Sequence, residues 1–191
     1  YAILGRLVGS ERCIRDRNYG QVFKEKDSAM VTHRALAINL VELDSLFIHA
    51  DTLIATGPPE RRIIRGFYGV RIFKEDLSGK TDSIYFNQTS GRAKLIRRPI
   101  SDRDLQYLTP QEIADRNPIL WSDESQMTGD EIHLTIDNEK EVLDSLLIYN
   151  NAFVIEQDSL DAANFNQIKG LQLKGKFKGK ILETVDVIQN T

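Results

Sequence analysis

Apolar and polar residues alternate with a period of two along most of the chain, in short runs rich in β-branched and aromatic residues. This alternation is typical of β-strands that have one buried and one solvated face. Clusters of Gly, Asp, Asn and Ser separate the runs and suit tight reversals of the backbone. We therefore expect antiparallel hairpins built from strands over residues 46–55, 63–73, 81–87, 92–97, 131–136, 142–149, 152–156, 168–177 and 181–188.

The alternation is interrupted between residues 101 and 117. There, Thr109, Pro110 and Glu112 form the pattern of an N-cap, a first-turn proline and a capping-box glutamate. Asn117 precedes a second proline, which ends the helical pattern. We expect a short helical insertion between two strands.

A recurring unit of a small residue followed by an apolar strand is the most informative feature of the sequence. Aligning the small residues Ala50, Thr81, Gly129 and Gly170 gives spacings of 31, 48 and 41 residues. Removing a helical insertion of roughly 20 residues brings the middle spacing close to the first. The chain therefore indicates stacked strand pairs. Residues 44–191 form the predicted domain, and residues 1–43 are a lead-in segment or the end of a preceding repeat.

The phase of the alternation predicts which side chains share a face, because residues two apart on a strand point the same way. Arg71, Lys94, Glu131, His133 and Lys174 fall on the solvated face. Residues 146–149 and 152–155 are apolar on both faces, which suits packing against a neighbour or a partner surface. The apolar face carries Val70, Ile72, Ile84, Phe86, Ala93, Leu95, Ile132, Leu134, Ala152, Val154 and Leu173.

The repeat, carried by residues 69–73, 127–134 and 146–155, resembles the OstA-like (organic solvent tolerance) family. This is the module of periplasmic lipopolysaccharide-transport proteins of the LptA type and of the amino-terminal part of LptD. The phrase at 44–53, an apolar triplet before Ala-Asp-Thr-Leu, strengthens the resemblance. Within the family, the chain is most similar to the larger OstA-like proteins of Bacteroidota.

The resemblance implies an open antiparallel β-jellyroll, a folded-over "taco" whose apolar interior accepts the acyl chains of lipid A. It implies a periplasmic, non-enzymatic protein that binds lipopolysaccharide and helps transport it to the outer membrane. The eleven apolar residues above would line the trough, at roughly 0.8 kcal/mol for each buried methylene. Other OstA-like domains or envelope transport proteins are the implied partners, through edge-to-edge pairing of a strand such as 181–188.

Composition and charge narrow the classes of function open to the chain. The 25 Lys and Arg nearly balance the 28 Asp and Glu, for a net charge of -3, which gives no field for general nucleic-acid binding. The apolar runs are far shorter than the roughly 20 residues of a transmembrane helix. Cys13 is alone, so there is no internal disulfide and no thiolate metal cluster. The chain begins at Tyr1 without Met, so we expect a longer precursor whose signal peptide is removed or lies outside this sequence.

Candidate chemistry is sparse. His33, His49 and His133 lack the close spacing of metal ligands, and we expect neither a metal site nor a cofactor. Asp82 and Asp130 recur at matching positions, which we interpret as turn chemistry at strand starts and not as a catalytic pair. We expect no enzymatic activity. The leading alternative function is a structural or assembly module that binds envelope proteins through its sheet edges, and an enzyme acting on envelope glycans comes third.

A group of basic residues lies between residues 61 and 98. Arginines on a strand face suit bidentate contacts to the phosphates of lipid A, because a guanidinium matches phosphate geometry. A solvated sheet face is the simpler explanation of the same residues. Both interpretations remain open at the level of the sequence.

Overall fold

A computed structural model describes residues 19–39, 45–58, 61–122, 125–137, 142–158, 164–178 and 181–188. Their strands join into one antiparallel 14-stranded sheet, so the predicted mainly β, antiparallel fold is confirmed. The elements in chain order are β1 (Gly20–Phe23), a 3-10 turn (Lys24–Lys26), β2 (Ser28–Val31), β3 (Ala35–Asn39), β4 (Leu46–Ala50), β5 (Thr52–Thr56), β6 (Ile63–Lys74), β7 (Leu77–Asn87), β8 (Arg92–Ile96), α1 (Asp102–Leu105), α2 (Pro110–Ala114), β9 (Ile119–Ser122), β10 (Ser125–Thr128), β11 (Glu131–Asp137), β12 (Val142–Gln157), β13 (Phe165–Lys178) and β14 (Ile181–Ile188).

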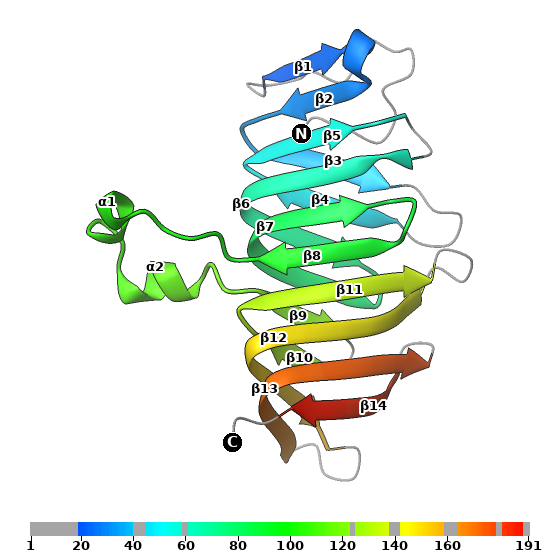
Figure 1. The fold of residues 1–191 in the computed structure, drawn as a ribbon, viewed down its shortest axis with the longest axis vertical. Helices are drawn as coiled ribbons and strands as arrows, with labels where there is room; N and C mark the ends of the chain where they lie inside the picture. Colours follow the sequence, from blue (N-terminus) through cyan, green and yellow to red (C-terminus); the bar gives the residue numbers. More distant parts are fainter. Residues whose placement is uncertain are drawn as a thin grey trace.

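The sheet is folded into two stacked layers, because its longest strands bend and exchange partners midway (Figure 1). The front layer contains β1, β2, β5, β8, β11 and β14, and the back layer contains β3, β4, β9 and β10. Strands β6, β7, β12 and β13 contribute one half to each layer. For example, β12 pairs with β11 up to Tyr149 and with β10 from Phe153 onward. Consecutive strands follow one another along the long axis of the molecule, from blue to red in Figure 1.

Left-handed backbone corners mark the side on which the strands bend, which we call the spine. Pairs of adjacent residues with positive φ occur there, at His33 and Arg34 between β2 and β3, at Tyr68 and Gly69 within β6, and at Asn150 and Asn151 within β12. Asn tolerates the left-handed region better than most residues with a side chain. Each corner redirects the chain from one layer to the other. The corners of β6 and β12 lie within a continuous strand, whereas β2 ends before the corner at His33 and Arg34 and β3 begins after it.

The repeated small residues of the sequence all lie along the spine. Ala50 is the last residue of β4, Gly129 separates β10 from β11, Thr81 pairs with Val70 just beyond the β6 corner, and Gly170 pairs with Ala152 just beyond the β12 corner. A Cβ atom on Gly129 would lie 2.3 Å from Cγ2 of Ile148. The recurring unit is therefore a place where two layers meet with little room for a side chain.

Pairing closes a ring in the middle of the molecule. Strand β7 pairs with both β8 and β9, and β12 pairs with both β11 and β10, so that β7, β8, β11, β12, β10 and β9 form a closed circuit of six strands. The helical insertion connects β8 to β9, which are two strands of this circuit. It projects away from the body of the protein (Figure 1). The open jellyroll implied by the resemblance stays a prediction.

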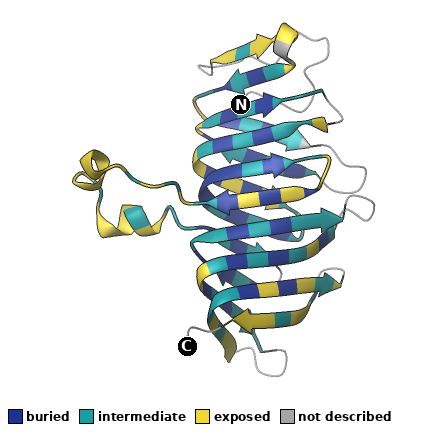
Figure 2. Ribbon diagram, in the orientation of Figure 1, coloured by how far each residue is buried: buried dark blue, intermediate teal, exposed yellow. Residues whose placement is uncertain are grey.

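One hydrophobic core fills the space between the layers. Along most strands its members alternate with partly or fully exposed residues, as the bands of Figure 2 show. Ile48, Leu53, Leu95, Leu120, Met127, Ile132, Ile148 and Leu173 are among its largest fully buried side chains. Burying a side chain of this size contributes about 1.5–3 kcal/mol relative to leaving it in water.

Several element boundaries differ from the sequence-based expectation. The single strand expected at 46–55 is two strands in different layers, because the chain changes layer at Asp51, whose N–H donates to the carbonyl of Tyr68 (3.0 Å). The two strands expected at 142–149 and 152–156 are one bent strand, β12. Within residues 1–43, β2 pairs with β5 and β3 pairs with β4, so the described part of this segment belongs to the same sheet.

The predicted helical insertion is confirmed, as two short helices. The capping box at α2 is complete: the Glu112 N–H donates to Thr109 Oγ1 (3.2 Å), and Glu112 Oε2 accepts from the Thr109 N–H (2.8 Å). Among the described residues, no helix has the length and apolar character needed to cross a membrane.

Candidate functional site

The eleven apolar residues predicted to line a trough all lie in the core between the layers, and none is more than 5% exposed. The front layer contributes seven of them, in β7, β8, β11 and β13, and the back layer contributes Val70, Ile72, Ala152 and Val154. Their pairing places them in continuous rows across the strands. The sequence therefore identified a set of side chains that the fold brings together.

The main interior row of the front layer runs through Ile84, Leu95, Ile132, Ile148 and Leu173, each paired directly with the next. At about 4.8 Å per strand, these five positions span about 19 Å along the long axis. All five are at most 4% exposed. The interior is thus a long apolar strip and not a pocket confined to one hairpin.

The back layer has a matching interior row that sequence reasoning missed in part. Ile48 pairs with Ile72, Leu120 pairs with Met127, and Met127 pairs with Val154. Of these, Ile48, Leu120 and Met127 were not among the predicted lining residues. Their period-two phase was a usable signal, but Ile48 and Leu120 lie outside the segments compared in the repeat, and Met127 is the first residue of one of them.

The most developed polar cluster is centred on Asp82, a buried carboxylate in β7 at the spine, with a side chain 2% exposed. Arg98 Nε donates to Asp82 Oδ2 (2.9 Å), Arg116 Nη2 lies 2.6 Å from Oδ1, and Ser83 Oγ donates to Oδ2 (2.8 Å). Burial alone would raise the pKa of Asp82, but the hydrogen bonds from Arg98, Ser83 and Arg116 outweigh it and hold the pKa below its usual value. Asp82 is therefore ionised at neutral pH.

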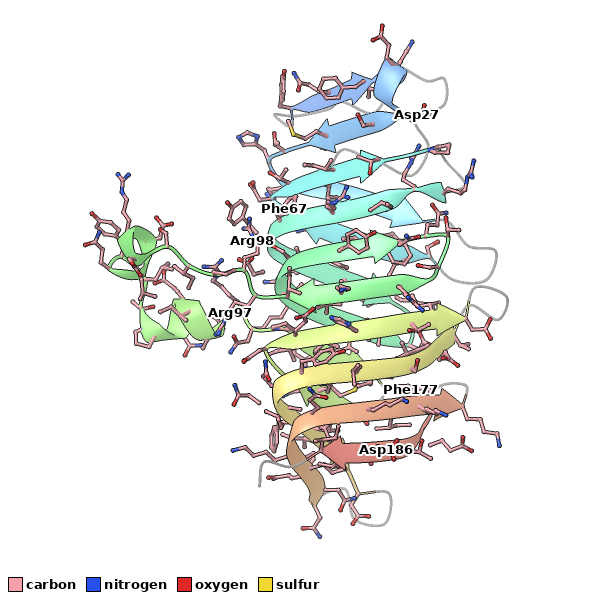
Figure 3. All side chains as sticks on the ribbon, in the orientation of Figure 1. Asp27, Phe67, Arg97, Arg98, Phe177 and Asp186 are labelled. Carbon is pink, nitrogen blue, oxygen red and sulfur yellow. The ribbon has the colours of Figure 1, made fainter. Side chains whose placement is uncertain are left out.

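Asp82 connects the body of the protein to both ends of the helical insertion. Arg98 precedes the helices and Arg116 follows them, and the Asp82 N–H also donates to the carbonyl of Arg116 (3.1 Å). Figure 3 shows Arg97 and Arg98 where the insertion leaves the sheet, with Phe67 beside Arg98. The guanidinium of Arg98 lies 4.2 Å from the ring centre of Tyr68 and 5.2 Å from that of Phe67.

An open groove of about 690 Å³ lies between the insertion and the spine. It is lined by Tyr68, Gly69, Asp82, Arg98, Pro99, Ile100, Asp104, Leu108, Glu112 and Arg116.

The carboxylates of this groove already have structural partners. Asp104 accepts a hydrogen bond from Ser101 Oγ (2.8 Å), and Glu112 caps α2. The pKa of Glu112 lies below its usual value because the Thr109 N–H and hydroxyl donate to it. Asp82 and Glu112 are both held ionised, and the contacts of the groove carboxylates are those of structural ion pairing and helix capping.

The three histidines lie in different parts of the fold. His33 is at the corner between β2 and β3, His49 lies on β4 and His133 lies on β11 beside Glu131 and Tyr149. Burial, and then the charges of Arg34 and Arg71, lower the pKa of His49, so its imidazole is neutral at pH 7. Among the residues that the structure describes, no group of three or more His, Cys, Asp or Glu side chains is arranged to hold a metal ion. Cys13 lies outside the described residues.

The basic stretch between residues 61 and 98 is distributed over both layers. Arg65 and Lys94 occupy outward positions of the front layer on either side of Tyr85, and the guanidinium of Arg65 lies 5.5 Å from the ring centre of Tyr85. Arg71 lies on the back layer, and Arg98 binds Asp82 at the spine. The stretch therefore does not form a single basic site.

No protein-family model matches the chain, and no curated protein matches it significantly in sequence.

Proposed function

We propose that this protein is a non-enzymatic, periplasmic lipid-binding protein that holds the acyl chains of lipopolysaccharide between its two layers and helps transport the lipid to the outer membrane. The observation that supports the proposal is the interior strip of Ile84, Leu95, Ile132, Ile148 and Leu173, which is uninterrupted by polar side chains. An acyl chain along this strip would gain about 0.8 kcal/mol for each methylene removed from water.

The way the layers are connected supports access for such a ligand. On the side opposite the spine, each connection joins strands of the same layer, as in the β6–β7 turn of the back layer and the β7–β8 turn of the front layer. Separating the layers along that side would leave the pairing within each layer intact. In the proposed lipid-bound state, the protein is the open β-jellyroll, and the six-strand ring persists because β7 and β12 cross between layers only at the spine.

Site-specific photo-crosslinking tests the proposal. A photoreactive amino acid placed at Ile84 or Ile132, which face the interior, should form adducts with labelled lipopolysaccharide. The same group at Lys94 or Glu131, on outward positions of the front layer, is the matched control and should give little adduct. Adducts at all four positions, or at none of them, contradict binding between the layers.

Edge-to-edge assembly with envelope proteins is the second candidate function. Strand β14 pairs only with β13 and β1 pairs only with β2 among the described strands, so each has an edge suited to strand addition. Sedimentation over a range of concentrations tests this candidate. Self-association that is lost in a Val187→Lys, Ile188→Lys variant supports it. A strict monomer at millimolar concentration that also captures no OstA-like partner contradicts it.

A further inference from the structure

The outward side of the back layer, which we call the outer back face, carries two apolar clusters that the interior does not use. The first is formed by Ile38, Phe47 and Phe73, which pair in succession across β3, β4 and β6. The second is formed by Ile119, Trp121, Phe153 and Ile155, on β9 and β12, which flank β10.

These side chains are accessible. Phe73 is 58% exposed, and its ring centre lies 6.3 Å from that of Phe47. Trp121, Phe153 and Ile155 are partly exposed. Trp121 Nε1 donates to Gln126 Oε1 (2.9 Å), so its polar atom is satisfied within the face. A solvated sheet face normally carries polar residues, and a broad apolar one marks an interaction surface.

Cations border the apolar clusters. Arg71 pairs with Lys80 and occupies the row next to the spine, and Lys169 extends this row on β13 beside Phe153. Phe73 lies one outward position farther from the spine than Arg71, toward the opposite side. In the row next to the spine the cations alternate with Ile119 and Phe153, and the next row away from the spine carries Phe47, Phe73 and Trp121.

Acidic residues are absent from the outward positions of the described back-layer strands. The carboxylate that contacts Lys80 of this face belongs to another element, because Asp115 of the insertion lies 3.4 Å from Lys80. The outward side of the front layer is different, because Glu131 and Asp186 lie among its Lys and Arg residues. Charge thus distinguishes the two outer faces.

We propose that the outer back face docks on the surface of an anionic lipid bilayer. Aromatic side chains such as Phe73 and Trp121 suit the boundary between head groups and acyl chains, and Arg71, Lys80 and Lys169 suit the lipid phosphates. A second copy is a poorer occupant, because the outward positions of the described back-layer strands carry cations and no carboxylates, so two such faces would bring like charges together. This surface is separate from the interior strip on which the proposed function rests.

Trp121 gives a direct readout, because it is the only tryptophan of the chain. Vesicles of phosphatidylcholine containing 30% phosphatidylglycerol should shift its fluorescence to the blue, and brominated acyl chains should quench it. Vesicles of phosphatidylcholine alone should give at least tenfold weaker binding. Raising the salt concentration should weaken binding to the anionic vesicles, because the cations interact with exposed phosphates.

Paired variants locate the surface. Two back-face variants are compared: the single variant Phe73→Gln and the double variant that combines Arg71→Gln with Lys169→Gln. Each should weaken binding to the anionic vesicles at least fivefold in a flotation assay. Tyr85→Gln and Lys94→Gln, at outward positions of the front layer, are the matched controls and should leave binding unchanged. Circular dichroism establishes that each variant is folded before it is compared.

Three outcomes overturn the proposal. The first is equal binding to neutral and anionic vesicles, or no binding at 1 mM lipid. The second is binding that the front-face variants weaken as much as the back-face variants do. The third is a monomer–dimer equilibrium, or capture of an acidic protein, that Phe73→Gln abolishes while vesicle binding is absent, which assigns the face to a protein partner. None of these outcomes depends on lipopolysaccharide binding between the layers.

Discussion

Asp82 and Arg116 lie 34 residues apart in the chain and are joined by both side chain and backbone. Arg116 Nε donates to Asp82 Oδ1 (2.8 Å), and the Asp82 N–H donates to the Arg116 carbonyl (3.1 Å). Arg98 completes the arrangement from the other end of the helical insertion. One buried carboxylate therefore fixes both ends of a segment that otherwise projects from the sheet.

Replacing Asp82 with Asn should lower the free energy of unfolding by about 2–4 kcal/mol, because two guanidiniums lose the anion that compensates their partial burial. Asp130→Asn is the matched control. Asp130 accepts only from Asn151 Nδ2 (3.1 Å and 3.3 Å) at a more exposed site, so we expect a loss below about 1 kcal/mol. Urea unfolding at pH 7 measures both values, and equal losses would contradict the assigned role of Asp82.

The lowered pKa of Asp82 predicts an acid-dependent loss of stability. Its ionised form is favoured in the folded state, so the stabilisation is complete above the pKa of the unfolded chain, near 3.8, and is lost as the pH falls through the lower folded value. The difference in unfolding free energy between wild type and Asp82→Asn should therefore shrink as the pH is lowered from 5 to below 3. A difference that stays constant over this range would mean that charge does not explain the effect.

Gly129→Ala should destabilise the protein by about 1–3 kcal/mol, because the new Cβ would lie 2.3 Å from Cγ2 of Ile148. Adding Ile148→Ala removes that contact, so the double variant should be less destabilised than the sum of the two single variants. At Gly69, where φ is 60° and an added Cβ would meet no atom within 4 Å, Ala should cost only about 1 kcal/mol of backbone strain. Chemical denaturation of the four variants measures these values.

Thr109→Ala should destabilise α2 locally by about 1 kcal/mol, because the capping box loses one of its two hydrogen bonds. Helix α2 contains no buried residue, so the midpoint of global unfolding should change little. Hydrogen exchange should become faster for the amides of residues 112–116 and remain unchanged in β7. Faster exchange in β7 would show that the insertion and the sheet unfold together.

Period-two alternation predicted the interior well, because residues such as Leu95 and Ile132 lie on strands whose two sides differ in solvation. It did not predict the corners. At Asp51 the chain changes layer with no Gly or Pro to mark the change, and at Asn150 and Asn151 a turn-like pair bends a strand without ending it. Local sequence describes each half of a bent strand but not the angle between the halves.

The role of Asp82 depended on contacts that no local pattern contains. Its repeat partner Asp130 was interpreted in the same way, as a turn residue at a strand start, yet Asp82 lies within β7. Its two arginines come from 16 and 34 residues farther along the chain. Only the path of the insertion brings these three side chains together.

Because the strands follow one another along the long axis, we expect this protein to unfold like a linear repeat protein. Each strand contacts mainly the strands beside it along this axis. The free energy of unfolding is therefore approximately a sum of the stabilities of the individual strands and of the contacts between adjacent strands, as in repeat proteins. Among the described strands, β1 and β14 have one neighbour each and should fray first under denaturant. The central units around β7 and β12 should persist longest, so unfolding should progress inward from the ends.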